Sequence, residues 1–171
     1  MKVAEAIPTE QRRRSSCGAA CIKNALRLLG TRVTEAKCRR LCGTTEAGTD
    51  ELEIAAGLKA LGYTHEPFTC RRGGPAVDAL RQHLTSGYPV ILCVDLDDHW
   101  VLACQLYGVD VVVHDPATGL RIVSEVALAG RWVSGKGEYY GMAIMPGSTE
   151  TRKRAARQRR PDLAAIARRT P

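Results

Sequence analysis

Apolar residues recur three and four positions apart in the first half of the chain, which is the period of an amphipathic helix. This spacing predicts four helices, over residues 17–29, 34–42, 51–61 and roughly 76–85. Ser15 or Ser16 is placed to cap the start of the first helix, and Gly30 to end it. The chain therefore begins with a helical half.

Short apolar runs separated by turn residues replace the helical pattern further along the chain. They predict strands at residues 63–69, 89–94, 100–107, 109–114, 121–123 and 140–145. Residues 115–119 read Asp-Pro-Ala-Thr-Gly, which is typical of a turn. Because the connections after residue 100 are short, these strands should form an antiparallel meander. We therefore expect an α+β domain with N-terminal helices packed on an antiparallel β-sheet.

Composition adds little to this picture and excludes some classes. A chain of 171 residues with 44% apolar and 25% charged residues suits one globular domain. No run of about 18 apolar residues is present, so no membrane span is predicted. Residues 1–10 lack the apolar stretch of a signal peptide. We expect a cytoplasmic protein.

The net charge of +7 is concentrated at one end of the chain. Residues 147–171 hold eight of the 25 basic residues and only two of the 18 acidic ones. We therefore divide the chain into a folded domain, 1–146, and an arginine- and alanine-rich tail, 147–171, which is helical with a break near Pro161, or disordered. Such a tail could contact nucleic acid or an acidic partner through charge, or simply be a solvated extension.

The seven cysteines are expected to be reduced in an intracellular protein. Cys38 and Cys42 lie four residues apart on a predicted helix, as do Cys17 and Cys21. Such pairs could bind a metal, but no CxxC or HxxxH motif accompanies them. Their interpretation as small buried hydrophobic residues is favoured, and no zinc site is implied.

Cys17 stands apart from the other cysteines because it opens a helix in the stretch Ser-Ser-Cys-Gly. The first turn of a helix has unpaired N–H groups and a partial positive charge, which favour a thiolate. Gly18 would leave room for a substrate backbone beside the sulfur. Cys21, one turn later, should face the core. Cys17 is thus the candidate nucleophile.

A nucleophilic thiol needs a histidine to move its proton and a third group to orient the ring. His65 and His83 are expected to be solvated, and His114 would serve only if its strand turned it inward. His99 opens a predicted strand after an acidic turn. A hairpin about Gly108 would bring His99 nearly opposite Asp115 on the next strand. Asp115 could alternatively do no more than begin the Asp-Pro turn.

An acyl-transfer site also needs donors for the developing oxyanion. Gln11 lies six residues before Cys17 and could fold back to supply a side-chain amide beside the N–H of the nucleophile. Spacing alone makes this a weak signal, since glutamines are common in loops.

Three motifs in order resemble those of the bacteriocin-processing cysteine peptidases, the papain-like domains that remove double-glycine leader peptides. They are Gln-x5-Cys-Gly-x-Ala-Cys at 11–21, His-aromatic-Val at 99–101 and Asp-Pro-x-x-Gly at 115–119. The segments ALRLLG, GTDELEIAAGLKALGY and LTSGYPVILCVD also fall where that family has equivalents. The resemblance covers roughly residues 11–146.

The resemblance implies a papain-like fold without a cofactor, and it assigns four roles. The nucleophile would be Cys17, the general base and acid His99, the orienting group Asp115, and the oxyanion donor Gln11. The chain departs from the family in having Ser16 where an acidic residue usually stands, and arginines at 12–14. These departures bear on the substrate more than on the chemistry.

The sequence supports two alternative functions for this protein. In the first, the protein is a cysteine peptidase that cleaves a peptide, with a Gly-Gly type site, through a thioacyl intermediate on Cys17. Acyltransfer or transpeptidation on the same site would share that first step. In the second, the fold is a binding scaffold and the tail at 147–171 contacts nucleic acid or an acidic partner. Rapid alkylation of Cys17 near pH 6 would favour the peptidase.

Overall fold

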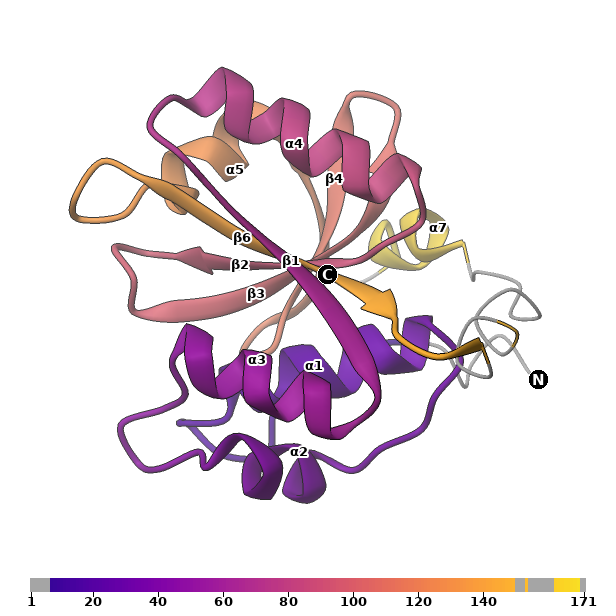
Figure 1. The fold of residues 1–171 in the computed structure, drawn as a ribbon. Helices are drawn as coiled ribbons and strands as arrows, with labels where there is room; N and C mark the ends of the chain where they lie inside the picture. The colour runs from indigo at the N-terminus through magenta and orange to yellow at the C-terminus, as the bar shows by residue number, and fades with distance from the viewer. Residues whose placement is uncertain (1–6, 150–152, 154–161, 170–171) are drawn as a thin grey trace.

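The computed structural model describes residues 7–149, 153 and 162–169. A six-stranded antiparallel sheet forms its middle layer, and helices cover both faces (Figure 1). The predicted α+β class is therefore confirmed. In the part of the chain that the structure covers, no helix has the length and apolar character needed to cross a lipid bilayer.

Three N-terminal helices cover one face of the sheet, as predicted: α1 (Cys17–Leu28), α2 (Glu35–Cys42) and α3 (Glu51–Ala60). Helix α1 packs against the centre of the sheet, and its stripe of Cys21, Ile22, Ala25 and Leu26 is fully buried. Helix α2 is capped by Thr34, and α3 by a reciprocal capping box between Asp50 and Glu53.

The strands lie in the order β1-β6-β2-β3-β4-β5. They are β1 (Tyr63–Cys70), β2 (Val90–Val94), β3 (His99–Tyr107), β4 (Asp110–Asp115), β5 (Gly119–Ser124) and β6 (Tyr139–Pro146). The predicted meander holds for β3, β4 and β5. It is wrong for β6, which pairs with β1 and β2 at the other side of the sheet. Because a helix follows β5, the chain can cross the sheet before β6 begins.

Two helices cover the second face, α4 (Gly73–Thr85) and α5 (Glu125–Trp132). Helix α4 begins three residues before its predicted start, because Pro75 fits in a first turn that needs no N–H there. Helix α5 was not predicted. Its only local start signal is Ser124, whose hydroxyl accepts from the N–H of Ala127. Trp132 at its end is completely buried.

Most of the predicted tail, including the region around Pro161, lies outside the described residues. Near the end of the tail, α7 (Leu163–Ala167) is a short helix capped by Asp162. Leu163 is 1% exposed and joins the hydrophobic core on the α1 side of the sheet. The division of the chain at residue 146 stays a prediction, but this segment packs against β3, β4 and β5.

Candidate active site

Cys17 is the first residue of α1, and Ser16 occupies the N-cap position before it. Contrary to expectation, the Ser16 side chain does not cap the helix. Its backbone is not extended, and its buried hydroxyl accepts instead from Nη1 of Arg39 at 2.6 Å. The arginine on α2 thus fixes the residue preceding the thiol from outside the helix.

Gly18 has a different role from the one expected. A side chain here would meet Thr49 at 3.2 Å, Ile54 at 3.3 Å and Trp100 at 3.4 Å. The missing Cβ therefore lets the loop before α3 and the start of β3 pack closely against α1, and does not provide space for a substrate. Cys21 faces the core as predicted, with its Sγ 3.4 Å from the carbonyl of Trp100.

The structure brings Cys17, His99 and Asp115 together. Nε2 of His99 lies 2.8 Å from Oδ1 of Asp115, and the same ring makes a hydrogen bond with the Cys17 side chain. Since Nε2 faces the carboxylate, Nδ1 is the nitrogen available to the thiol. Oδ1 of Asp115 also accepts from the main-chain N–H of Ala117 at 2.9 Å. Asp115 thus both orients the ring and begins the turn.

A β-bulge sets the relation between His99 and Asp115. Near the turn, Tyr107 pairs with Asp110, and that register alone would place His99 and Asp115 on opposite faces of the sheet. The register shifts between Ala103 and Gln105, so that Leu102 pairs with His114. Continued to the strand end, this register places Asp115 diagonally from His99 on the same face. The expectation that the two residues come nearly opposite therefore holds, through a diagonal contact two residues away from direct pairing.

The electrostatics of these groups support an ion pair. Burial alone would raise the pKa of the Cys17 thiol, but the His99 hydrogen bond and main-chain contacts of Trp100 and Gly18 lower it below its usual range. The hydrogen bond that the His99 ring donates to Asp115, followed by the one it makes with Cys17, raises the pKa of His99 to about 9. Despite burial, the His99 contact lowers the pKa of Asp115 to about 2.

Four of the other cysteines are held in the thiol form. Burial raises the pKa of Cys21 well above its usual value, and those of Cys38 and Cys93 to about 12. Cys42 is raised to about 11 by the same cause. Cys38 and Cys42 lie in the hydrophobic core, as their helical spacing suggested. Among the described residues, no group of three or more His, Cys, Asp or Glu side chains is placed to hold a metal ion.

The remaining histidines lie away from these contacts. His65 is in β1, as the predicted strand there implied, and is partly buried. His83 on α4 is also partly buried and stacks on Phe68 with ring centroids 5.5 Å apart. His114 does point inward, toward α1, but its Nδ1 lies 3.3 Å from the Asn24 amide. Burial lowers the pKa of His114 to about 4, which keeps its ring neutral.

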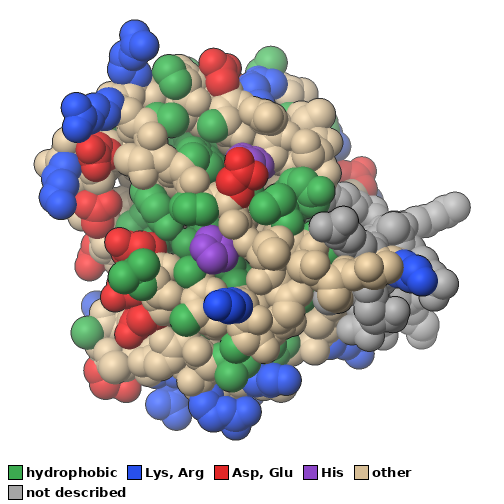
Figure 2. Space-filling view, viewed as in Figure 1, with side chains coloured by type: hydrophobic (Ala, Val, Ile, Leu, Met, Phe, Trp, Pro, Cys, Tyr) green, Lys and Arg blue, Asp and Glu red, His purple; other side chains and the backbone are tan. Residues whose placement is uncertain are grey.

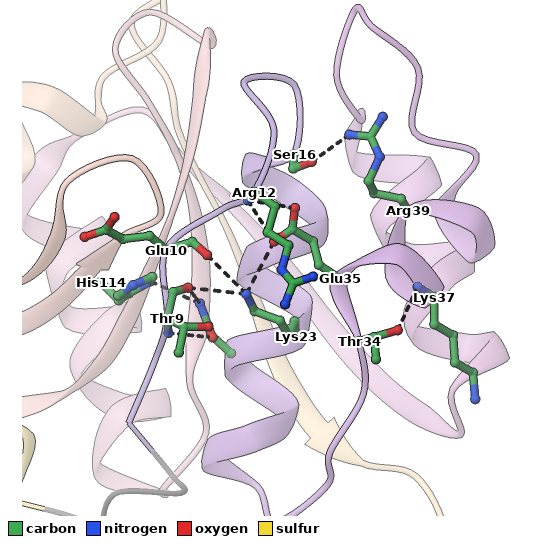
Figure 3. A network of polar contacts seen from close by, with 11 residues as sticks. Thr9, Glu10, Arg12, Ser16, Lys23, Thr34, Glu35, Lys37, Arg39 and His114 are labelled. Carbon is green, nitrogen blue, oxygen red and sulfur yellow. Dashed lines mark hydrogen bonds and ion pairs between the residues drawn. The ribbon is translucent and has the colours of Figure 1, made fainter.

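The segment that carries Gln11 is tied down along its length. The N–H of Gln11 donates to the carbonyl of Pro116 at 2.8 Å, so the segment is joined to the turn that follows Asp115. The buried Glu35 carboxylate accepts from the N–H of Arg12 and pairs with Lys23 (Figure 3). The Gln11 side chain donates one N–H to the carbonyl of Arg14 at 3.0 Å, and an amide nitrogen carries two.

Arg131 is a site residue that the sequence did not suggest. It lies in the last turn of α5, and its Nη2 is 3.4 Å from Oδ2 of Asp115. It also forms an ion pair with Asp95 in the turn before His99. Because α5 itself was missed, the position carried no signal that could have separated it from other surface arginines.

A cleft of about 740 Å³ is lined by residues of the loop before α3, the start of β3 and the segment around the start of β6, and neither Cys17 nor His99 is among its lining residues. Thr49 and Trp100, which pack on Gly18, contribute to its wall. Its acidic lining residues come from α3, the β2–β3 turn and the segment before β6: Asp50, Glu51, Glu53, Asp97 and Glu138. Figure 2 shows acidic side chains gathered along the edge where β2 runs into β3. A ligand in this cleft would lie against Thr49 and Trp100, the two lining residues that pack next to Gly18.

The chain matches the model of the peptidase C39 family over residues 6–136. No protein with curated annotation matches it in sequence.

Solved structures of peptidase domains share the fold. The peptidase domain of Streptococcus ComA, a bifunctional ABC transporter involved in quorum sensing, is 18% identical with a TM-score of 0.65, over 82% of this chain and 98% of that one. A double-glycine-motif protease from an AMS/PCAT transporter, in complex with its leader peptide, is 18% identical with a TM-score of 0.67, over 82% and 91%. A C39-like peptidase from Bacillus anthracis is 13% identical with a TM-score of 0.63, over 81% and 94%.

Proposed function

Because the chain belongs to the peptidase C39 family, we propose that it is a cysteine peptidase with Cys17 as the nucleophile. The observation that carries this proposal is the shared ring of His99, which contacts the Cys17 thiol on one side and Asp115 at 2.8 Å on the other. A thiol, an imidazole and an orienting carboxylate in that sequence of contacts are the parts of a nucleophilic acyl-transfer site.

The first half of the reaction uses the ion pair. The Cys17 thiolate attacks the carbonyl carbon of the scissile peptide bond, and the carbonyl oxygen becomes negatively charged. The imidazolium of His99 then gives its proton to the departing amine as the C–N bond breaks. A thioester between Cys17 and the acyl part of the substrate remains. Asp115 keeps the His99 ring aligned both before and after the ring gives up this proton.

The second half regenerates the thiol. His99, now neutral, takes a proton from a water molecule, which attacks the thioester carbonyl and releases the acid product. The same step would transfer the acyl group to an amine if an amine reached the thioester before water. Hydrolysis is the step we propose, since nothing in the described residues marks a second acceptor site.

Gln11 is proposed as the side-chain donor to the oxyanion, beside the N–H of Cys17. The second N–H of its amide is not used by the Arg14 carbonyl. Two main-chain hydrogen bonds support a fixed position for Gln11. Its own N–H donates to the carbonyl of Pro116, and the N–H of Arg12 donates to the Glu35 carboxylate. Preorganised donors of this kind stabilise the tetrahedral intermediate.

The proposed substrate is a peptide or protein with a Gly-Gly type cleavage site. The support is the family membership and the shared fold with a protease whose structure holds a leader peptide. A location in the cytoplasm and a contact of the 147–171 tail with nucleic acid or an acidic partner stay predictions.

The test compares the wild type with two cysteine variants. A peptide carrying a Gly-Gly site is incubated with each protein, and the products are identified by mass spectrometry. Wild type and Cys93→Ala should cleave, because Cys93 lines the cleft but its thiol is held protonated. Cys17→Ala should not cleave. Denaturing the wild type during turnover should trap an adduct on Cys17.

Two results would reject the proposal. One is equal cleavage by Cys17→Ala and wild type. The other is equal alkylation of all seven cysteines by iodoacetamide near pH 6, with no cleavage of any peptide, which would favour the binding scaffold.

A further inference from the structure

Arg131 joins two carboxylates that lie on either side of His99 in the sequence. Its Nε donates to Oδ1 of Asp95 at 2.9 Å, and its Nη2 contacts both Oδ2 of Asp95 and Oδ2 of Asp115, the latter at 3.4 Å. The main chains are joined as well, since the N–H of Asp95 donates to the Arg131 carbonyl at 2.8 Å. The end of α5 is therefore held to the β2–β3 turn by main chain and side chain together.

The turn that Arg131 holds has an unusual backbone. Asp95, Leu96 and Asp97 have φ angles of 56°, 60° and 72°, in the left-handed region that non-glycine residues disfavour. Leu96 is 68% exposed, so its side chain adds little packing. Three such residues in a row need outside contacts to persist. Arg131 supplies such contacts to Asp95, at the start of the turn. His99, the first residue of β3, follows two residues after Asp97, the last residue with a positive φ angle.

The second carboxylate is the one that orients the catalytic ring. Oδ1 of Asp115 is occupied by His99 and by the N–H of Ala117. Oδ2 is the atom that faces Arg131. With both oxygens held, rotation of the carboxylate about its Cβ–Cγ bond is opposed. Asp115 is 6% exposed, so little water is present to take the place of these partners.

We propose that Arg131 is a positioning residue for the acid–base pair, and that it locks the His99 turn and the Asp115 carboxylate into one unit. Its planar guanidinium can bridge two carboxylates at once, which a lysine ammonium on a flexible stem does poorly. Asp97 in the same turn lines the large cleft. Through Arg131, the cleft wall and the catalytic carboxylate are therefore coupled.

The direction in which the pKa of His99 changes in Arg131→Ala distinguishes a positioning role from a purely electrostatic effect of the arginine charge. Removing a positive charge near His99 would by itself favour the imidazolium and raise the pKa of the ring. Loosening the Asp115 contact would lower that pKa from about 9 toward its usual value of about 6.5. If Arg131 positions the Asp115 carboxylate, the pKa of His99 falls in Arg131→Ala.

The experiment follows the His99 ring by NMR titration in four proteins: wild type, Arg131→Ala, Arg131→Lys and Arg81→Ala. Arg81 on α4 pairs with Glu125 at the other end of α5, so its variant weakens the docking of the same helix without touching the site. We expect the pKa to fall in Arg131→Ala, to fall less in Arg131→Lys, and to stay unchanged in Arg81→Ala. Thermal melting shows that each variant is folded.

The kinetic effect rests on the proposed peptidase function and is measured separately. Misplacing a catalytic group by about 1 Å can cost about a hundredfold in rate, so Arg131→Ala should lose about tenfold to a hundredfold in kcat, with a smaller change in KM. If no protein cleaves peptide but the titrations behave as expected, the proposed function fails and this inference stands. A raised or unchanged His99 pKa in Arg131→Ala, or full recovery in Arg131→Lys, overturns the inference.

Discussion

Replacing Asp115 by asparagine should move the alkaline limit of activity by about two pH units. The amide keeps the size of the carboxylate and can still accept from the ring, but it carries no charge. The pKa of His99 is about 9, and the Asp115 hydrogen bond is the largest cause. Compared with an unperturbed ring, this corresponds to about 3 kcal/mol in favour of the imidazolium, shared between Asp115 and Cys17.

If Asp115 accounts for the larger part of this stabilisation of the imidazolium, the pKa of His99 in Asp115→Asn falls to about 7. At pH 8 the protonated fraction of the ring then drops from about nine-tenths to about one-tenth. The imidazolium donates the proton to the leaving amine, so kcat/KM at pH 8 should fall at least about tenfold from this cause alone. At pH 6 the loss from protonation nearly vanishes, and what remains measures lost orientation.

The assay is kcat/KM for a Gly-Gly peptide from pH 5 to 10, together with an NMR titration of His99. Asp110→Asn serves as the control, because Asp110 lies at the other end of the same strand, opposite Tyr107. An alkaline limb that stays near pH 9 in Asp115→Asn would refute the assignment of Asp115 as the group that holds the imidazolium.

Three further outcomes are expected. Gln11→Ala should lower kcat by about 10²–10³ with little change in KM, as for other lost oxyanion donors, and an effect on KM alone in steady-state kinetics would contradict its role. Asp115 has its pKa lowered to about 2, so its contribution of about 2 kcal/mol to stability is present above about pH 3.8 and is lost as the pH falls through about 2. Urea unfolding should therefore show the advantage of wild type over Asp115→Asn shrinking from pH 5 to 2, whereas a constant difference would count against it. Leu163→Ala should cost about 2–5 kcal/mol of unfolding free energy and the partly buried Ile166→Ala less, so equal midpoints in urea would show that α7 does not stabilise the fold.

The helices and most strands were predictable because each carries its own local signal. The stripe on α1, the capping box before α3 and the apolar run of β2 need no knowledge of the rest of the chain. Helix α5 and the place of β6 in the sheet depend instead on which face remains uncovered after the first helices have packed. That choice is made by tertiary contacts, and a short helix with one serine cap does not reveal it.

The site was predictable in its residue types but not in its geometry. Cys17, His99 and Asp115 follow from the chemistry that a thiol nucleophile requires, and they lie together. The register that joins them depends on a bulge at the centre of β3, which alternation in the sequence does not mark. Arg131 could not be selected, because its contacts with Asp95 and Asp115 depend on where α5 packs.

The extra residue in β3 constrains how this hairpin can change in length. Loss of one residue of β3 between the turn and His99 would restore a regular ladder of hydrogen bonds, so the protein could still fold. The His99 ring and the Asp115 carboxylate would then lie on opposite faces of the sheet. A gain or loss of one residue in one strand alone would turn the ring to the other face, whereas one residue gained or lost in each strand would keep the pair together. Natural variation in hairpin length among active proteins of this kind should accordingly come in even steps.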